Sequence, residues 1–362
     1  MYFISKKESD CFVEWSDTVI HGESEPLDFR SMMRPVLLPV FYFYCGVLLC
    51  KLGQVQRGMD CFRRGSMYES DNMFSNAFVA SFMERHDYEL TIPAVCFEDP
   101  LPFIHFSTTP ELKTARKNFI IQAGRSLPRV ERPFKLMDIG TGNGVLAVEL
   151  LLHLKRCDII KEIEEILLID SSSAMLELAS TYVKDNFPDA KVTTLQGRIQ
   201  DVADNIEGVY DAALCSLSYH HMPMADKRLN LVKLKEKFNN LLLFELNADN
   251  DLPEMDSPEL LLAVYQSYGA MIDCIFAHDA PLEVTIDAVD SFLMTEQMSF
   301  LLESRGERSD YHATRSQWIE LFDDVLCPEF ECFCDGSCMS DDYYELFNLH
   351  YGRVCQGKKC RK

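Results

Sequence analysis

The chain has 362 residues, enough for one sizeable α/β domain and a smaller unit. Hydrophobic residues make up 47% and charged residues 25%, which is typical of a soluble globular protein and excludes an intrinsically disordered one. The 57 acidic residues outnumber the 35 lysines and arginines, and the resulting net charge of -22 repels phosphate backbones. We therefore expect no nucleic-acid partner.

Cysteine usage points to a reducing compartment. The 14 cysteines lie mostly inside apolar runs, as at Cys45, Cys50 and Cys215, without the even spacing of a secreted disulfide scaffold. The N-terminal stretch lacks the apolar run of a signal peptide, and the apolar run 35–50 is too short to span a bilayer. We expect a cytoplasmic protein without a membrane segment.

The first clear pattern along the chain, at about residues 38–70, predicts a helical hairpin. Small residues at Gly46, Gly58 and Gly65 mark where two helices cross closely, and Gly53 ends the first helix in a left-handed cap. The spacing resembles one tetratricopeptide hairpin. Because a single copy cannot form a solenoid, two interpretations stay open: a hairpin packed on the main domain, or a peptide-binding groove.

The segments around this hairpin are less patterned. Residues 1–34 are acidic and predict a small lead-in helix or an arm, whereas the proline-rich stretch 91–110 predicts a linker or lid with little regular structure. A helix is expected over 110–127. We therefore divide the chain into a helical N-terminal region, residues 1–110, and a larger domain, residues 111–362.

From residue 134 onward, strands and helices alternate. The short apolar runs are rich in branched residues, as expected of strands buried on both faces of a parallel sheet with right-handed crossovers. The predicted strands are Phe134–Ile139, Ile166–Asp170, Val192–Gly197, Tyr210–Leu217 and Asn240–Leu246. The predicted helices are Val145–Arg156, Ser172–Asn186 and Asp226–Phe238, with a short one over 199–206.

After the fifth predicted strand the alternation stops. An insertion follows over about 247–311, and its apolar spacing is helical. Two closely linked segments at the end of the domain predict an antiparallel strand pair. The elements expected here are helices over 259–275, 284–302 and 316–326, and strands over 329–336 and 343–353.

A glycine-spaced turn, Asp138-Ile-Gly-Thr-Gly-Asn-Gly144, joins the first strand to the first helix of the domain. Gly140, Gly142 and Gly144 permit a sharp turn and the close approach of a ligand, because no Cβ is in the way. The helix that follows points its N–H groups and its positive dipole end at that ligand. The turn therefore predicts a nucleotide-type ligand at the carboxyl end of the first strand.

Five stretches in order resemble the class I S-adenosylmethionine (SAM)-dependent methyltransferases. They are Asp138–Gly144, Leu167–Asp170, Tyr210–His221, Leu241–Glu245 and the terminal strand pair. This resemblance covers about residues 134–353. It implies an α/β fold with a Rossmann-like seven-stranded sheet, mostly parallel with the last strand antiparallel, with helices on both faces, and SAM as the cofactor.

The resemblance also implies which residues contact SAM. The first loop would surround the methionine moiety, because backbone N–H groups suit its carboxylate and Asp138 suits its ammonium. Asp170 would accept the ribose hydroxyls and is also compatible with an N-cap role. The adenine contact is less defined, because Gly197 is followed by Arg198. It passes to Gln200, to Asp201, or to backbone groups near Arg198 and Ile199. The implied cofactor residues are Asp138, Gly140, Thr141, Gly142, Asn143, Gly144, Asp170, Ser171, Gln200 and Ser216.

The fourth strand ends in Cys215-Ser-Leu-Ser-Tyr-His-His221, which the resemblance places opposite the transferred methyl group. His221 matches a histidine common in small-molecule methyltransferases of this fold. It is either a general base or a structural cap of the following turn. Tyr219 and His220 are further catalytic candidates. The asparagine-proline-proline-aromatic motif of amino methylation is absent, which argues against DNA adenine methylation.

The insertion carries the expected substrate side. Arg305 or Arg308 is expected to bind an anionic group, together with Tyr311 and His312; the alternative is a solvated loop. The cysteines near the C-terminus have no Cys-x2-Cys pair, so no metal site is expected. They are Cys327, Cys332, Cys334, Cys338, Cys355 and Cys360.

Together these features predict a SAM-dependent methyltransferase that acts on a small molecule. Two alternatives remain: a peptide or protein methyltransferase that binds its substrate through the N-terminal region, and a non-catalytic SAM-binding scaffold. No nucleic-acid or membrane partner is expected, and a homodimer is left open.

Overall fold

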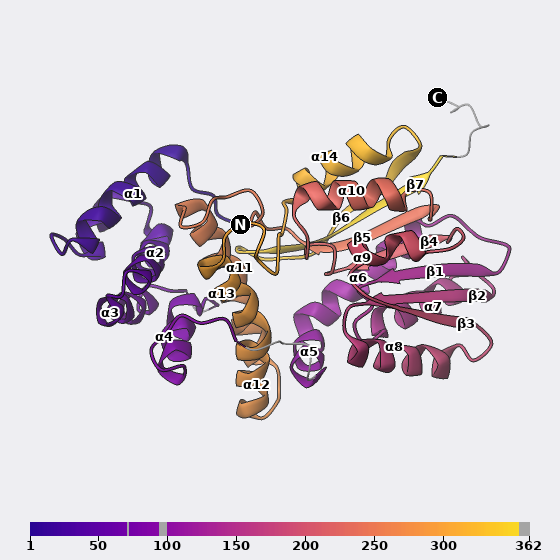
Figure 1. Cartoon of the computed structure of the whole chain (residues 1–362), viewed down its shortest axis with the longest axis horizontal. Coiled ribbons are helices and arrows are strands. Elements are labelled where there is room, and N and C mark those ends of the chain that lie inside the picture. Colours follow the sequence, from indigo (N-terminus) through magenta and orange to yellow (C-terminus); the bar gives the residue numbers. More distant parts are fainter. Residues whose placement is uncertain (71, 94–99, 355–362) are drawn as a thin grey trace.

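The computed structural model describes residues 1–70, 72–93 and 100–354. A cluster of helices and a twisted sheet flanked by helices lie side by side (Figure 1). The N-terminal helices are α1 (Lys6–Ile20), α2 (Leu38–Lys51), α3 (Val55–Ser66), α4 (Ser75–Arg85), α5 (Pro100–Ser107) and α6 (Pro110–Ser126). Short 3-10 helices at Pro26–Met32 and Pro35–Leu37 precede α2.

The predicted helical hairpin is confirmed in α2 and α3, which cross at their glycines. A Cβ on Gly46 would lie 2.6 Å from the Phe62 ring, and one on Gly58 would lie 2.3 Å from Cys50 Sγ. Gly53 has a φ of +75° between the two helices. The backbones can approach this closely only because these positions carry no side chain. The tetratricopeptide resemblance of the hairpin stays a prediction.

The prediction of little regular structure over 91–110 is wrong in its second half. Residues Pro100–Ser107 form α5, which begins with a proline, a residue that favours the first turn of a helix. Phe106 of α5 packs against Phe292 of the insertion with ring centroids 4.7 Å apart. Tertiary packing of apolar side chains thus overrides the proline content, and residues 94–99 lie outside the described residues.

The seven strands form one sheet in the order β3-β2-β1-β4-β5-β7-β6. The strand pairs from β3 to β5 are parallel, and β7 lies antiparallel between β5 and β6, which confirms the predicted sheet. The strands are β1 (Phe134–Ile139), β2 (Ile163–Asp170), β3 (Lys191–Gln196), β4 (Ala212–Ser216), β5 (Asn240–Leu246), β6 (Phe330–Ser340) and β7 (Glu345–Arg353).

Alternate residues of the strands face two separate cores. Leu136 belongs to one hydrophobic cluster and its neighbour Met137 to the other, as the two-residue period of a strand requires. Helices cover both faces of the sheet (Figure 1). Outside the insertion, the helices that follow β1 are α7 (Val145–Arg156), α8 (Ser173–Asn186), α9 (Ile199–Val202), α10 (Met224–Leu234) and α14 (Arg315–Leu326). A short 3-10 helix at Ala203–Asn205 extends α9.

The insertion after β5 is helical, as predicted. It contains α11 (Pro258–Ala277), α12 (Leu282–Ala288), a π-helical turn at Val289–Leu293, and α13 (Met294–Leu302). By length and composition α11 could cross a bilayer, but 72% of its apolar window is buried inside the protein, which is typical of a core helix. Tyr265 of α11 packs against Phe43 of α2, with ring centroids 5.6 Å apart. The N-terminal helices therefore rest on the insertion.

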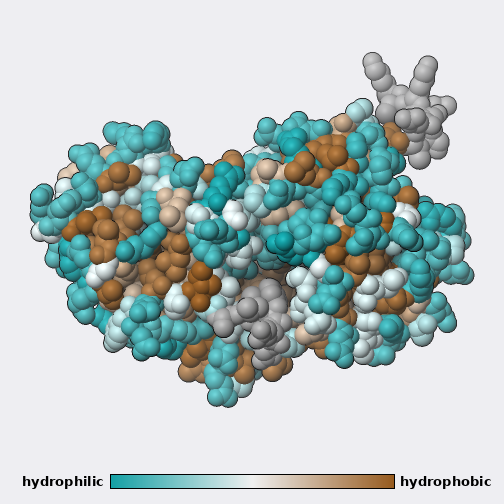
Figure 2. All heavy atoms as spheres, in the orientation of Figure 1, coloured by the Kyte–Doolittle hydropathy of each residue, from teal (hydrophilic) through white to brown (hydrophobic). Residues whose placement is uncertain are grey.

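Most of the surface visible in Figure 2 is hydrophilic, with hydrophobic side chains gathered over the N-terminal helices and in smaller patches over the sheet half.

Candidate active site

The glycine loop between β1 and α7 is held by backbone geometry that favours glycine. Gly140, Gly142 and Gly144 have φ angles of +69°, +53° and +76°. A Cβ on Gly140 would lie 2.2 Å from the Cβ of Ser218, so the loop packs directly against the residues that follow β4. Gly144 is the N-cap of α7. The N-terminal end of α7 therefore begins at the loop, as predicted.

Asp170, at the end of β2, fixes the other side of this loop. Its carboxylate accepts the Gly142 N–H at 2.9 Å through Oδ2 and the Ser172 N–H at 2.9 Å through Oδ1. Burial raises the pKa of Asp170 above its ordinary value, against the lowering effect of these bonds. The N-cap of α8 is Ser172, whose side chain accepts the Met175 N–H. Asp170 is thus placed between the loop and the start of α8.

Asp138 and Thr141 bond to each other, away from the cavity described below. The Thr141 hydroxyl donates to Asp138 Oδ2 at 2.6 Å, and Asp138 is 3% exposed. Burial raises the pKa of Asp138 to about 7, with a further contribution from the negative charge of Asp170. These two residues therefore support the loop from within.

A cavity of about 420 Å³ joins the glycine loop to the insertion. Its volume is in the range of small-molecule sites. Of the predicted cofactor residues, Gly140, Gly142, Asp170, Ser171, Gln200 and Ser216 line it, whereas Asp138, Thr141, Asn143 and Gly144 lie outside the lining given by the described residues. The lining also includes Phe103, Phe106 and Arg116 from α5 and α6, and Met271, Phe292, Glu296, Arg308 and His312 from the insertion side.

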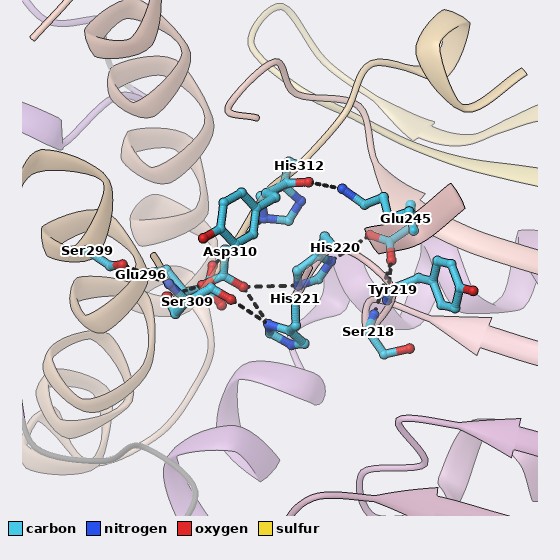
Figure 3. A network of polar contacts seen from close by, with 12 residues as sticks. Ser218, Tyr219, His220, His221, Glu245, Glu296, Ser299, Ser309, Asp310 and His312 are labelled. Carbon is cyan, nitrogen blue, oxygen red and sulfur yellow. Dashed lines mark hydrogen bonds and ion pairs between the residues drawn. The ribbon is translucent and has the colours of Figure 1, made fainter. Parts of the chain in front are cut away.

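The far end of the cavity holds a cluster of histidines and carboxylates (Figure 3). His220 Nδ1 lies 2.8 Å from Glu245 Oε2, and its Nε2 lies 3.4 Å from Asp310 Oδ1. His221 Nδ1 lies 2.6 Å from the same Asp310 oxygen. His312 stacks on His220 with ring centroids 4.1 Å apart. The cluster lies where β5, the segment after β4 and the loop before α14 meet.

The two neighbouring histidines of the cluster have opposite electrostatic environments. For His220, burial lowers the pKa well below its ordinary value, and the neighbouring histidines lower it further. For His221, burial also acts to lower the pKa, but the Asp310 carboxylate outweighs it and raises the pKa to about 9. The His221 side chain is 40% exposed and pairs with Asp310, which favours its protonated form, whereas burial favours the neutral form of His220.

Of the predicted substrate residues, Arg308 and His312 line the cavity. Arg308 is 4% exposed, donates to the Glu303 and Asn250 carbonyls, and has no partner for Nη2 among the described residues. Arg305 instead pairs with Asp251 at 2.8 Å, outside this lining.

Tyr311, a predicted substrate residue, and Tyr219, a predicted catalytic residue, have structural contacts. The Tyr311 N–H donates to the His220 carbonyl at 2.8 Å, and its hydroxyl accepts the Gly306 N–H. Tyr219 is 2% exposed, and its hydroxyl donates to Asn230 on α10. Their side chains lie outside the cavity lining of the described chain. Both residues position the backbone on which the neighbouring histidines stand.

Several residues in the cavity wall or behind it were missed by sequence reasoning. Glu245 lies behind the lining, next to the last residue of a buried strand, and a carboxylate at that place was the one available signal. Glu296 and Arg116 lie within amphipathic helical patterns that resemble ordinary surface faces. Asp310 directly precedes the predicted residues Tyr311 and His312 but gives no signal of its own in the sequence. Its two histidine partners come from another segment of the chain.

The comparisons with known proteins agree with this geometry. Residues 136–236 match the family described as a methyltransferase domain. No curated protein matches the chain. The solved structure of SCL7 from Oryza sativa is similar in fold, with a TM-score of 0.57 and 15% identity over 81% of this chain and 93% of that chain. A magnesium protoporphyrin IX methyltransferase from Synechocystis PCC 6803, solved with bound SAM, has a TM-score of 0.37 and 13% identity over 67% of this chain and 79% of that chain.

The residues present fit SAM. The Asp170 carboxylate lines the cavity next to a glycine loop, and a Cβ on Gly142 would lie 3.1 Å from the Phe103 ring, so the loop leaves little space for a side chain. A carboxylate and aromatic walls suit the ribose and adenine parts of the cofactor. The N–H groups of Gly140, Gly142 and Gly144 are bonded within the protein, so the loop's contribution is the space that its glycines leave. Residues 136–236 thus match a methyltransferase domain, and they lie on a Rossmann-like sheet beside a cavity whose residues fit SAM.

Proposed function

We propose that the protein transfers a methyl group from SAM to a small-molecule acceptor. The observation that carries this proposal is the single cavity that extends from Gly140, Gly142 and Asp170 to the insertion. Residues of α5, α6, α11 and α13 contribute to its walls, which favours an acceptor enclosed by the protein over an extended chain.

The N-terminal hairpin gives less support to a peptide acceptor. The α2 helix is buried on nearly every side, and it packs against α1, α3 and α11. A peptide-binding groove needs an uncovered face of the hairpin, so this packing favours a supporting role.

In this function, residues of the chain bind SAM and align the acceptor with its methyl group. SAM supplies an activated sulfonium methyl group, so alignment of the acceptor provides much of the rate. Asp170 binds the ribose hydroxyls, and Gly140 and Gly142 allow the backbone to approach the cofactor. Phe103 and Phe292 exclude water from the cavity. Arg308 presents a positive charge to an acidic acceptor group, whereas the charges of the His221–Asp310 ion pair cancel.

Titration calorimetry with SAM tests the cofactor site. We expect Asp170→Asn to weaken SAM binding by about 10- to 100-fold, because charged hydrogen bonds to a ligand contribute about 1.5–3 kcal/mol. Asp204→Asn is the matched control, since that side chain is 76% exposed and pairs with Lys233. Equal affinity of the two variants would contradict the assignment of Asp170.

Release of S-adenosylhomocysteine in the presence of acceptors tests the substrate class. We expect turnover with members of a panel of small hydroxylated or thiol-containing molecules and none with unstructured peptides. Turnover with peptides alone would refute the small-molecule proposal. SAM binding without turnover on either panel would support the scaffold alternative.

A further inference from the structure

Three side chains at the inner end of the cavity have the arrangement of a metal-ligand set. His220, Asp310 and His312 each offer a ligand atom, and these atoms all lie within 4.8 Å of one another. Each of the three residues is at most 4% exposed. Two imidazole nitrogens and one carboxylate oxygen are donors that Zn²⁺ and similar divalent transition metals accept.

Glu245 orients His220 as an outer carboxylate orients a metal-bound histidine. Glu245 Oε1 accepts the Ser218 and Tyr219 N–H groups at 3.1 and 3.0 Å, which places Oε2 2.8 Å from His220 Nδ1. With the proton on Nδ1, the lone pair of Nε2 points toward Asp310, 3.4 Å away. A lone pair facing a carboxylate is repulsive unless a cation lies between them.

His312 provides an independent indication of a ligand. Neither of its ring nitrogens has a hydrogen-bond partner among the described residues, although the side chain is buried and lines the cavity. Its closest carboxylate contact is Glu296 Oε2, 4.0 Å from Nε2. Buried polar atoms without partners cost about 1–3 kcal/mol each, so they are rare in native proteins unless a ligand satisfies them.

We propose that His220, Asp310 and His312 bind one divalent transition-metal ion, with Zn²⁺ as the reference ion. His220 binds through Nε2, because Glu245 occupies the Nδ1 side. His221, 2.6 Å from Asp310, holds the carboxylate in place from the cavity side. Figure 3 shows the three ligands converging from the segment after β4 and from the loop before α14.

Three protein ligands leave a coordination position open, which is typical of catalytic metal sites. His220 and His312 both line the cavity, so this position is accessible to an acceptor. A hydroxyl or thiol bound there would lose its proton more easily and become a better methyl acceptor. This role rests on the proposed function, whereas metal binding itself does not depend on it.

The test uses the full chain after chelator treatment and dialysis. We expect calorimetry to show one Zn²⁺ bound per chain, and Co²⁺ substitution to give a visible spectrum of nitrogen and oxygen coordination. His312→Phe keeps the ring shape and removes both nitrogens, so it should abolish this binding. Glu245→Gln should weaken binding by about 10- to 100-fold, as expected for an outer partner of a metal-bound histidine. His21→Ala is the control, because the His21 side chain is 64% exposed.

The outcomes separate this site from other metal-binding groups and from the cofactor site. Unchanged Zn²⁺ affinity in His312→Phe overturns the proposal, as does a thiolate-to-cobalt charge-transfer band, which would assign the ion to cysteines. Loss of Zn²⁺ with SAM affinity retained supports it, since SAM binding shows that the variant is folded. Failure of the wild-type protein to bind SAM would refute the proposed function and leave the metal result interpretable.

Discussion

The contact between Gly140 and Ser218 allows a quantitative test of how the cofactor loop is held. In Gly140→Ala, the new Cβ would lie 2.2 Å from Ser218 Cβ, and the backbone would keep a φ of +69°. The left-handed conformation costs a residue with a Cβ about 1–2 kcal/mol, and overpacking of this kind costs about 1–3 kcal/mol. We therefore expect the free energy of unfolding to fall by about 2–5 kcal/mol.

A double-mutant cycle separates these two contributions. Ser218→Gly removes the clashing atoms and leaves Ser218 Cα at 3.6 Å from the new Cβ, an ordinary contact distance. Alone, this change loses the hydrogen bond from Ser218 to the Ile139 carbonyl, worth about 1 kcal/mol. In the double variant, the overpacking cost disappears and the backbone cost remains. The two changes should therefore be non-additive by about 1–3 kcal/mol.

Urea unfolding followed by circular dichroism measures the four unfolding free energies, and calorimetry with SAM measures cofactor affinity in parallel. Additive effects within about 0.5 kcal/mol would show that the loop and the end of β4 move apart freely. A Gly140→Ala variant as stable as the wild type would refute the whole argument, including the left-handed conformation at this position.

Two further predictions concern buried ionisable groups away from the loop. Burial lowers the pKa of His350 to about 4. Between pH 6.5 and 4 the unfolded chain therefore binds more protons than the folded one, and acidification lowers the free energy of unfolding by about 3 kcal/mol in total. Thermal unfolding of wild type and His350→Gln from pH 7 to 4 should show the stability difference between them shrinking, and a constant difference would contradict this assignment. Lys227→Met removes a fully buried cation that lies 3.6 Å from Asp251 and donates to the Tyr311 carbonyl. We expect a loss of about 3 kcal/mol in chemical denaturation, because the buried Asp251 carboxylate keeps only Arg305 as a cationic partner and the Tyr311 carbonyl loses its donor. Unchanged stability would contradict this role of Lys227.

The sheet and the cofactor loop could be predicted closely from the sequence. The predicted bounds of β1, α7 and β5 agree with the structure to the residue. Each is a mostly apolar run bounded by a glycine, a charged residue or an asparagine, so local pattern and tertiary structure require the same element. The loop from Gly140 to Gly144 could also be predicted from local sequence, because its positive φ angles favour glycine in any surroundings.

The inner end of the cavity could not be predicted in the same way. His220 and His312 are separated by more than 90 positions in the sequence, and their contact depends on how the insertion folds back over the sheet. Single residues such as Glu296 give no periodic signal that distinguishes a cavity wall from a solvated helix face. The α5 helix was missed for a related reason, since its stability comes from contacts with the insertion rather than from local propensity.

The packing of α2 and α4 on α11 has a consequence for synthesis and truncation. The α2 helix is apolar all round, and its partner α11 begins only at Pro258, about 200 residues later in the chain. During translation, the first helices must therefore remain exposed until the insertion emerges from the ribosome, a period in which chaperones can bind them. Conversely, a shortened chain that starts at residue 111 would leave Tyr265 and Gly269 without Phe43 and Ser75, their neighbours in the intact protein. Such a fragment should aggregate even though its sheet is complete.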